Sequence, residues 1–170
     1  MRTTLRVLLG CMLLLLFTPA CARVQSDSLT FDAVKFSQPL GLSDIMQTYP
    51  DVGILLGAQA ESDMTFVVGS IDNKRSGETF LLVERRSMID CGNHGCPLTF
   101  FVRREQSRYD IVPSSIVVGP EIWAATCSDS TIFALSGGKV RYGLWKYDQR
   151  SLTHVNNADH LEHVTTAICN

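Results

Sequence analysis

Residues 131–145, TIFALSGGKVRYGLW, carry the clearest structural signal in this chain of 170 residues. The apolar run Thr131 to Leu135 has the length of a strand, and Ser136-Gly137-Gly138-Lys139 follows it. A Gly-Gly pair supplies the positive φ angles of a tight turn. From Val140 to Leu144, apolar side chains then occupy every second position, which is the period of a half-buried strand. The stretch predicts two antiparallel strands joined by a tight turn.

Runs of similar length recur on both sides of this hairpin, separated by turn signals every eight to twelve residues. Phe80 to Val83 and Leu98 to Val102 are apolar on both faces, as expected of central strands covered on both sides. The spacing predicts a mainly β domain of antiparallel strands, arranged as a sandwich, a curved sheet or a partial barrel. The other predicted strands are Leu29 to Phe36, Val52 to Leu56, Met64 to Val68, Arg108 to Val112, Ile116 to Val118, Ile122 to Ala125 and Leu152 to Val155.

Two short helices are expected at the ends of this domain. Near the N-terminus, Ser43 can cap a helix over Asp44 to Thr48, which Pro50 would end. Near the C-terminus, Asn157 can cap a second helix. The apolar residues that would share one face of that helix are Ala158, Leu161, Val164 and Ile168.

The first 22 residues have the pattern of a secretory signal peptide. Arg2 and Arg6 give a positive start, an apolar run extends from Val7 to Phe17, and Ala20-Cys21-Ala22 fits the small-x-small cleavage rule. The run is too short to cross a bilayer, and no later stretch approaches the ~20 apolar residues that a spanning helix needs. We therefore expect a periplasmic or secreted bacterial protein, in which residues 23–28 are a mobile leader and residues 29–170 form a single β-rich domain.

Cys21 leaves a second processing route open. The segment Thr18-Pro19-Ala20-Cys21 is similar to a lipobox, in which Cys21 is lipidated and becomes the new N-terminus. This route would anchor the domain to a bacterial membrane, whereas ordinary cleavage would release it. Contact with a membrane is expected only if Cys21 is lipidated.

The charge balance argues against nucleic acid as a partner. Removal of residues 1–22 takes away two arginines and no acid, which leaves 13 basic and 17 acidic side chains and a net charge of −4. A weak acidic charge favours solubility and provides no basic surface for phosphates. Export also excludes functions that depend on cytosolic nucleotides.

Four cysteines remain in the expected domain: Cys91, Cys96, Cys127 and Cys169. An even number in an exported chain predicts two disulfides, for which three pairings exist. Cys91 and Cys96 are the natural pair, because the turn-rich segment Gly92-Asn93-His94-Gly95 can fold the backbone back between them. Cys127 would then pair with Cys169 and pin the C-terminal tail onto the sheet.

Metal binding is the competing interpretation for two groups of residues. Cys91, His94 and Cys96 could hold a metal, but an oxidising compartment favours the disulfide. Redox-active pairs usually have two intervening residues and lie at the start of a helix, unlike this pair. His160 and His163 are three residues apart on the expected C-terminal helix and could share a metal, yet the sequence places no further ligand beside them. We expect no metal and no other cofactor.

The order of these features resembles a known group of proteins. Asp90-Cys91-Gly92-x-x-Gly95-Cys96 stands between two predicted strands and is followed by a hairpin and later by the Gly-Gly turn. Residues 64–155 are similar in this order to small bacterial periplasmic and lipoprotein β domains with a C-G-x-x-G-C disulfide loop. The resemblance implies a β fold and an exported location, and most members have no established activity. Members often carry an Asp-x-Asn-Gly-Asp-Gly-like loop. The matching stretch here, residues 72–78, lacks the acidic ligands, so calcium binding is not expected to carry over.

Three groups of side chains are candidates for binding. Asn93 and His94, at the tip of the predicted disulfide loop, are the candidate contact residues. Five arginines near that loop could hold an anionic glycan or a lipid phosphate, but interleaved acids predict a neutralised surface instead. The arginines are Arg85, Arg86, Arg103, Arg104 and Arg108, and the acids are Glu84, Asp90, Glu105 and Asp110.

Four aromatic residues could form a platform for a sugar or a peptide, although in alternating strands core positions and cross-strand pairs are expected. They are Trp123, Tyr142, Trp145 and Tyr147.

The sequence lacks two usual motifs for nucleophilic and zinc-dependent hydrolysis, since Gly-x-Ser-x-Gly and His-Glu-x-x-His are both missing. We therefore expect a binding or accessory protein of the bacterial envelope, without catalytic activity, whose partner is a protein or another envelope component. An inhibitor or immunity-type protein that blocks a cell-wall-degrading enzyme with the Cys91–Cys96 loop is the alternative. A hydrolase assembled from scattered residues is the third interpretation.

Overall fold

The computed structural model describes residues 27–58, 64–89, 91–92, 95–105, 107–118, 121–137 and 140–170. The predicted signal peptide, Cys21 and most of the leader lie outside these residues. In the described part of the chain, no helix is long and apolar enough to cross a membrane.

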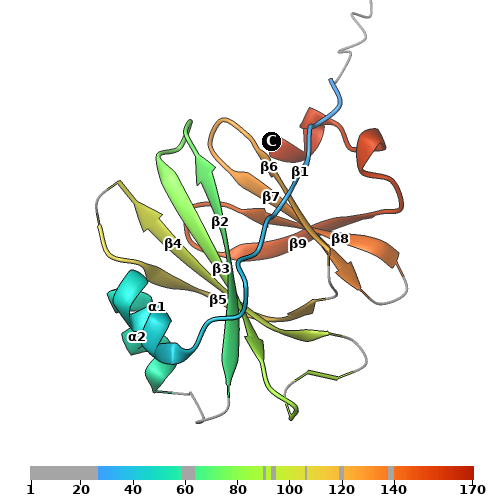
Figure 1. Ribbon diagram of the computed structural model, residues 1–170. Helices are drawn as coiled ribbons and strands as arrows, with labels where there is room; N and C mark the ends of the chain where they lie inside the picture. The colour runs from blue at the N-terminus through green and yellow to red at the C-terminus, as the bar shows by residue number, and fades with distance from the viewer. Residues whose placement is uncertain are drawn as a thin grey trace, which may run out of the picture.

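Two antiparallel sheets pack against each other (Figure 1). One sheet has four strands in the order β2-β3-β4-β5, and the other has five in the order β1-β6-β7-β8-β9. The predicted mainly β, antiparallel architecture is confirmed, and among the described residues the sheets do not close into a barrel. The strands are β1 Asp32–Ala33, β2 Thr65–Asn73, β3 Glu78–Arg86, β4 Cys96–Arg104, β5 Asp110–Val118, β6 Ile122–Thr126, β7 Thr131–Gly137, β8 Val140–Tyr147 and β9 Leu152–Ala158.

The core between the sheets is built from alternate residues of the central strands. The rings of Phe80 and Phe100 both pack edge to face on Phe133, at centroid distances of 5.3 and 5.0 Å. The residues next to these phenylalanines along each strand face the opposite way. Leu81 packs beneath the two helices, and Ile132 packs beneath Leu29 and the C-terminal tail. β3 and β4 are therefore covered on both faces, as their apolar sequences predicted.

Helices α1 (Leu42–Thr48) and α2 (Pro50–Gly57) cover the outer face of the four-stranded sheet. The prediction of a strand at Val52 to Leu56 was wrong, because Pro50 stands at the first helical turn and starts α2. Val52 and Leu56, four residues apart, then point to the same side and are buried against the sheet.

The first helix was predicted in nearly the right place, but its cap was not. α1 begins at Leu42 with Gly41 as its N-cap, and Ser43 lies inside the first turn. Asp44 takes the capping role, since its carboxylate accepts a hydrogen bond from the Gly41 N–H at 3.0 Å. Pro50 separates the two helices and does not end the helical region.

The C-terminal residues cover the outer face of the five-stranded sheet. The prediction of one C-terminal helix capped by Asn157 was wrong, because Asn157 pairs with β8 as part of β9. Two short 3-10 helices follow instead, η1 (Leu161–His163) and η2 (Thr166–Cys169). The apolar residues assigned to the helix nevertheless all pack on this sheet, among them Val164 in the core and Ile168 beside it.

The N-terminal segment ties the two sheets together along one edge (Figure 1, blue to cyan). Only Asp32–Ala33 forms a strand, paired with β6, and not the whole predicted stretch from Leu29 to Phe36. The chain then crosses to β2, where Leu40 and Phe66 exchange backbone hydrogen bonds of 2.7 and 2.9 Å. Gly69 permits this crossing, because a Cβ atom there would lie 2.6 Å from Val34 Cγ1.

The hairpin predicted from residues 131–145 is confirmed as β7 and β8, which pair from Thr131 with Tyr147 to Ser136 with Tyr142. The two predicted strands at 108–112 and 116–118 are one strand, β5. Its pairing with β4 shifts between Leu98 and Phe100, which places Pro113 in a bulge, where a residue without an N–H is tolerated.

Candidate functional site

The connection between β3 and β4 is closed by a disulfide. Cys91 and Cys96 are bonded, with their Cα atoms 4.2 Å apart, as the sequence predicted. Inside the loop, Gly92 and Gly95 exchange two backbone hydrogen bonds of 3.1 Å each. Gly95 has a φ angle of 114°, which side-chain-bearing residues rarely adopt. The base of the loop is therefore fixed both covalently and by hydrogen bonds.

The second predicted disulfide, Cys127–Cys169, is also present, with a Cα–Cα distance of 5.7 Å. Lys146 adds to it, since its Nζ donates a hydrogen bond to the Cys169 carbonyl at 2.6 Å. The C-terminal tail is thus pinned to the sheet, as expected. Two disulfides in one small domain indicate an oxidising, extracellular-type environment.

Two large apolar side chains stand in solvent next to the Cys91–Cys96 disulfide. Met88 is 97% exposed and Ile89 is 83% exposed, the highest values among the exposed large apolar residues of the described chain. A backbone hydrogen bond from Cys91 N–H to the Ser87 carbonyl, 3.2 Å long, closes the turn that carries them. Two adjacent large apolar side chains exposed to water mark this turn as a candidate contact surface.

The sequence interpretation missed Met88 and Ile89, although a signal was present. Two large apolar residues stand between Ser87 and Asp90 in a segment of turn residues, where no core position is available. The predicted contact residues, Asn93 and His94, lie outside the described residues. They belong to the same loop and remain a prediction.

The five arginines do not gather around this loop, so that expectation was wrong. The strands β3 and β4 pair Glu78 with Arg104 and Glu84 with Leu98, which places Arg103 and Arg104 at the far end of the sheet. Only Arg85 and Arg86 lie at the end of β3 that leads into the loop.

The expected neutralisation is confirmed for Arg86, which pairs with one of the named acids, and Arg104 pairs with another acid, Glu78. Arg86 Nε lies 3.0 Å from Glu84 Oε1, and Arg104 Nε lies 3.2 Å from Glu78 Oε1. Arg103 contacts an aromatic ring: its guanidinium lies 4.8 Å from the centre of the Tyr109 ring.

Glu78, Arg104 and Tyr147 form a polar network that the sequence did not reveal. Glu78 is 4% exposed and accepts hydrogen bonds from Arg104 Nε and from Ser76 Oγ, the latter at 3.0 Å. Arg104 Nη2 donates to the Tyr147 hydroxyl at 3.1 Å. The hydrogen bond to Glu78 raises the pKa of Arg104, and burial raises the pKa of Tyr147. The network joins the two sheets and has a structural role.

His160 and His163 come together, although on a 3-10 turn. Their ring centroids are 5.5 Å apart. Glu162 lies between them in sequence, and its Oε1 is 3.3 Å from His160 Nδ1. A hydrogen bond from its own backbone N–H and the two nearby histidines lower the pKa of Glu162. Within the described residues, no group of three side chains is arranged to hold a metal.

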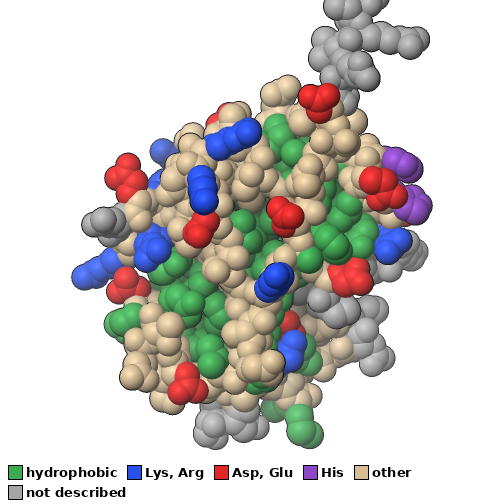
Figure 2. All heavy atoms as spheres, turned by 45° about the horizontal axis from the view of Figure 1, so that its top comes forward, with side chains coloured by type: hydrophobic (Ala, Val, Ile, Leu, Met, Phe, Trp, Pro, Cys, Tyr) green, Lys and Arg blue, Asp and Glu red, His purple; other side chains and the backbone are tan. Residues whose placement is uncertain are grey.

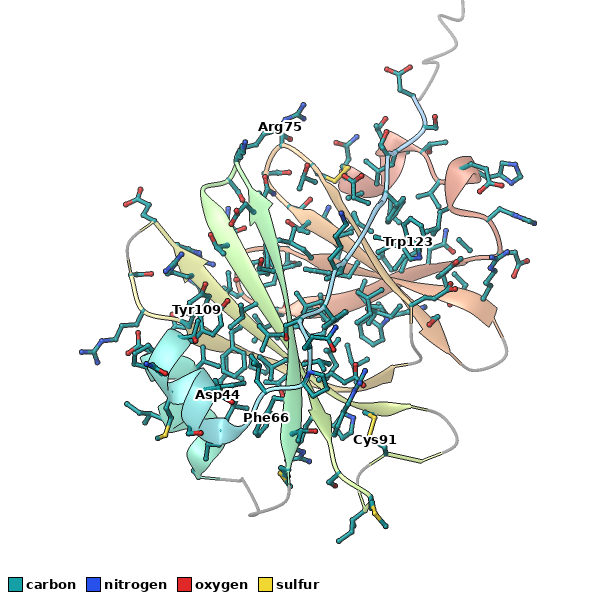
Figure 3. All side chains as sticks on the ribbon, in the orientation of Figure 1. Asp44, Phe66, Arg75, Cys91, Tyr109 and Trp123 are labelled. Carbon is teal, nitrogen blue, oxygen red and sulfur yellow. A yellow bond between two sulfur atoms is a disulfide. The ribbon has the colours of Figure 1, made fainter. Side chains whose placement is uncertain are left out.

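The four aromatic residues of the candidate platform are divided between two faces of the five-stranded sheet. Tyr147 is buried between the sheets, and Trp145 packs beside that core with its ring 5.3 Å from His154. Trp123 (Figure 3) lies on the outer face with Tyr142. Together with Phe31, these residues line an open groove of about 550 Å³. The four residues do not form a single platform: the expected core position is confirmed for Tyr147, and Trp123 and Tyr142 form part of a groove.

Comparison of the chain with protein-family models, with curated proteins and with solved structures yields no match. The two surfaces that geometry singles out are the loop with Met88 and Ile89 and the groove with Trp123.

Proposed function

We propose that this is an exported binding protein without catalytic activity, which engages a protein of the bacterial envelope through the connection between β3 and β4. The observation that carries the proposal is the exposure of Met88 and Ile89 beside the Cys91–Cys96 disulfide. Their placement requires an apolar pocket on the partner.

The energetics of the loop suit this role. Burial of one large apolar side chain contributes roughly 1.5–3 kcal/mol, so two such side chains can dominate a contact. The disulfide and the hydrogen bonds between Gly92 and Gly95 fix the base of the loop before binding. A preorganised loop loses less conformational entropy when it docks.

The same geometry favours the inhibitor or immunity-type version of this function. Cys91 lies at the end of the strands, away from the helices and from the groove of Trp123 (Figure 3). An exposed apolar pair on the turn that leads into a closed loop fits a concave site better than a flat surface. A cell-wall-degrading enzyme, whose substrate cleft is concave, is the partner class that we propose.

A photocrosslinking amino acid placed at position 89 tests this function. In cells, we expect one dominant one-to-one adduct with an envelope protein. The matched control carries the same group at Val155, which is also exposed but lies on β9 of the other sheet. No adduct at position 89, or the same adduct from both positions, would overturn the proposal.

Export has a separate test. The two disulfides support an oxidising location. We propose that the N-terminal segment is removed either by cleavage after Ala22 or by cleavage before a lipidated Cys21. The mass of the native N-terminal peptide distinguishes a free terminus at Arg23 from a lipidated Cys21. An intact N-terminus at Met1 or Arg2 would contradict export by either route.

A further inference from the structure

The groove on the outer face of the five-stranded sheet combines an aromatic floor with a charged rim. Trp123 and Phe31 form part of its floor, and Arg141, Asp159, His160 and Glu162 stand around it. Figure 2 shows hydrophobic side chains gathered beside histidines on this side of the molecule, with acidic and basic side chains around them.

The floor is held in place from several directions. Trp123, on β6, pairs with Ala33 of β1, two residues after Phe31. The Tyr142 hydroxyl donates a hydrogen bond to Glu121 Oε2 at 3.0 Å, and the Arg141 guanidinium lies 5.4 Å from the centre of the Tyr142 ring. Segments far apart in the chain thus build one surface.

The rim is positioned by the C-terminal tail. Asp159 and His160 follow β9, and Glu162 lies in η1, between the sheet and the residue that forms the Cys127–Cys169 disulfide. The pKa of Glu162 is lowered, first by its own backbone N–H and then by His160, His163 and Arg141. The rim therefore presents two carboxylates and a guanidinium around one groove.

We propose that this groove binds a neutral saccharide, with one apolar face of a pyranose ring against Trp123 and its hydroxyls hydrogen-bonded to Arg141 and Asp159. A sugar ring has both an apolar face and a polar circumference, which matches the floor and the rim. This ligand differs in class from the protein partner proposed for the β3–β4 loop.

Other ligand classes match the groove less well. An anion would meet the carboxylates of Asp159 and Glu162, and a cation would meet Arg141. A purely apolar ligand would leave these polar groups desolvated without partners, at a cost of about 1–3 kcal/mol for each group. Hydroxyl groups can donate to the carboxylates and accept from the guanidinium at the same time.

Tryptophan fluorescence offers a direct test, because the chain has two tryptophans. In the Trp145→Phe variant, Trp123 is the remaining tryptophan. The probes are the linear tetramers of N-acetylglucosamine and of glucose. We expect at least one of them to shift the Trp123 emission in a saturable way, with an affinity confirmed by calorimetry.

Substitutions at the rim decide whether the groove is the site. Asp159→Asn and Arg141→Gln, both at exposed positions, are each expected to weaken binding about tenfold, the equivalent of one charged hydrogen bond. Arg150→Gln, an exposed arginine in the β8–β9 turn, is the control and is expected to bind like the parent. No change in Trp123 emission with either tetramer at ~10 mM, a concentration that detects even millimolar affinity, would overturn the proposal. So would affinities that the rim variants leave unchanged, or stronger binding of an apolar tetrapeptide.

Discussion

Asn73 and Thr131 connect the two sheets through a hydrogen bond of 3.1 Å from Asn73 Nδ2 to Thr131 Oγ1. Asn73 ends β2 in one sheet, and Thr131 begins β7 in the other. Asn73 also donates to the Ser130 carbonyl at 3.2 Å and accepts from the backbone N–H groups of Arg75 and Ser76. With 1% of its surface exposed, it has both amide donors and its carbonyl oxygen satisfied inside the protein.

Replacement of Asn73 by alanine is therefore expected to lower the free energy of unfolding by about 3 kcal/mol, because several buried groups lose their partner at once. Urea denaturation measures this loss. The control is Asn156→Ala on the exposed face of β9, which is expected to change stability by no more than about 0.5 kcal/mol. Equal effects at the two positions would contradict the role of Asn73.

Tyr147 gives the protein a sensitivity to alkaline pH. Burial raises its pKa above the ordinary value of about 10. A group whose pKa is raised in the folded state contributes its full stability below the unfolded pKa and loses it as the pH rises through the folded pKa. The free energy of unfolding is expected to fall above about pH 10, and to fall less steeply in Tyr147→Phe.

The Tyr147→Phe variant is expected to keep part of the loss of stability at alkaline pH, because burial raises the pKa of Tyr109 as well. Urea denaturation between about pH 8 and 12, a range that spans the tyrosine pKa, measures both curves. If the free energy of unfolding falls equally with pH in the parent and in Tyr147→Phe, ionisation of Tyr147 does not destabilise the folded state, which would contradict this prediction.

Gly53 and Gly57 provide a matched pair within α2. A Cβ atom at Gly53 would lie 2.6 Å from Met46 Cγ and 2.7 Å from Met46 Cα, so that α1 would have to move. Gly53→Ala is expected to lower the free energy of unfolding by about 2 kcal/mol through overpacking. At Gly57 the nearest atom would be 3.8 Å away, and alanine there is expected to be neutral or slightly stabilising. Similar changes at both positions would contradict close packing of the two helices.

The two disulfides are expected to contribute unequally to stability. Their cysteines are 42 and 5 residues apart in sequence. Loop-closure entropy assigns about 4 kcal/mol to Cys127–Cys169 and about 2 kcal/mol to Cys91–Cys96. Urea denaturation of the two double Cys→Ser variants tests this order, and a larger loss from the Cys91–Cys96 pair would contradict it. Non-reducing peptide mapping checks the pairing itself.

Local signals predicted most of the sheet. The apolar runs of β3 and β4 predicted central strands, and the Gly-Gly pair at residues 137–138 predicted the chain reversal between β7 and β8. The run Val52 to Leu56 failed because a short apolar segment fits a buried strand and a helix equally well. Asn157 failed because pairing between β9 and β8, a long-range interaction, overrode its capping tendency.

The candidate surfaces were only partly visible in the sequence. The Cys91–Cys96 loop could be located from the spacing of its two cysteines. The exposure of Met88 was not predicted, because it depends on which side chains the folded core buries. The groove of Trp123 could not be predicted, because it joins the N-terminal segment, β6, β8 and the C-terminal tail. Residues so distant in sequence acquire a common chemistry only when the fold brings them together.

The central claim is that Met88 and Ile89 dock into a partner. Once the crosslink identifies that partner, calorimetry with the Met88→Ser/Ile89→Ser variant tests the claim most directly. Both side chains are exposed, so the variant is expected to keep the stability of the parent. We predict an affinity at least ~100-fold lower, equivalent to the loss of about 3 kcal/mol of apolar burial. The Val155→Ser control is expected to bind like the parent, and an affinity of the double variant equal to that of this control would contradict the account.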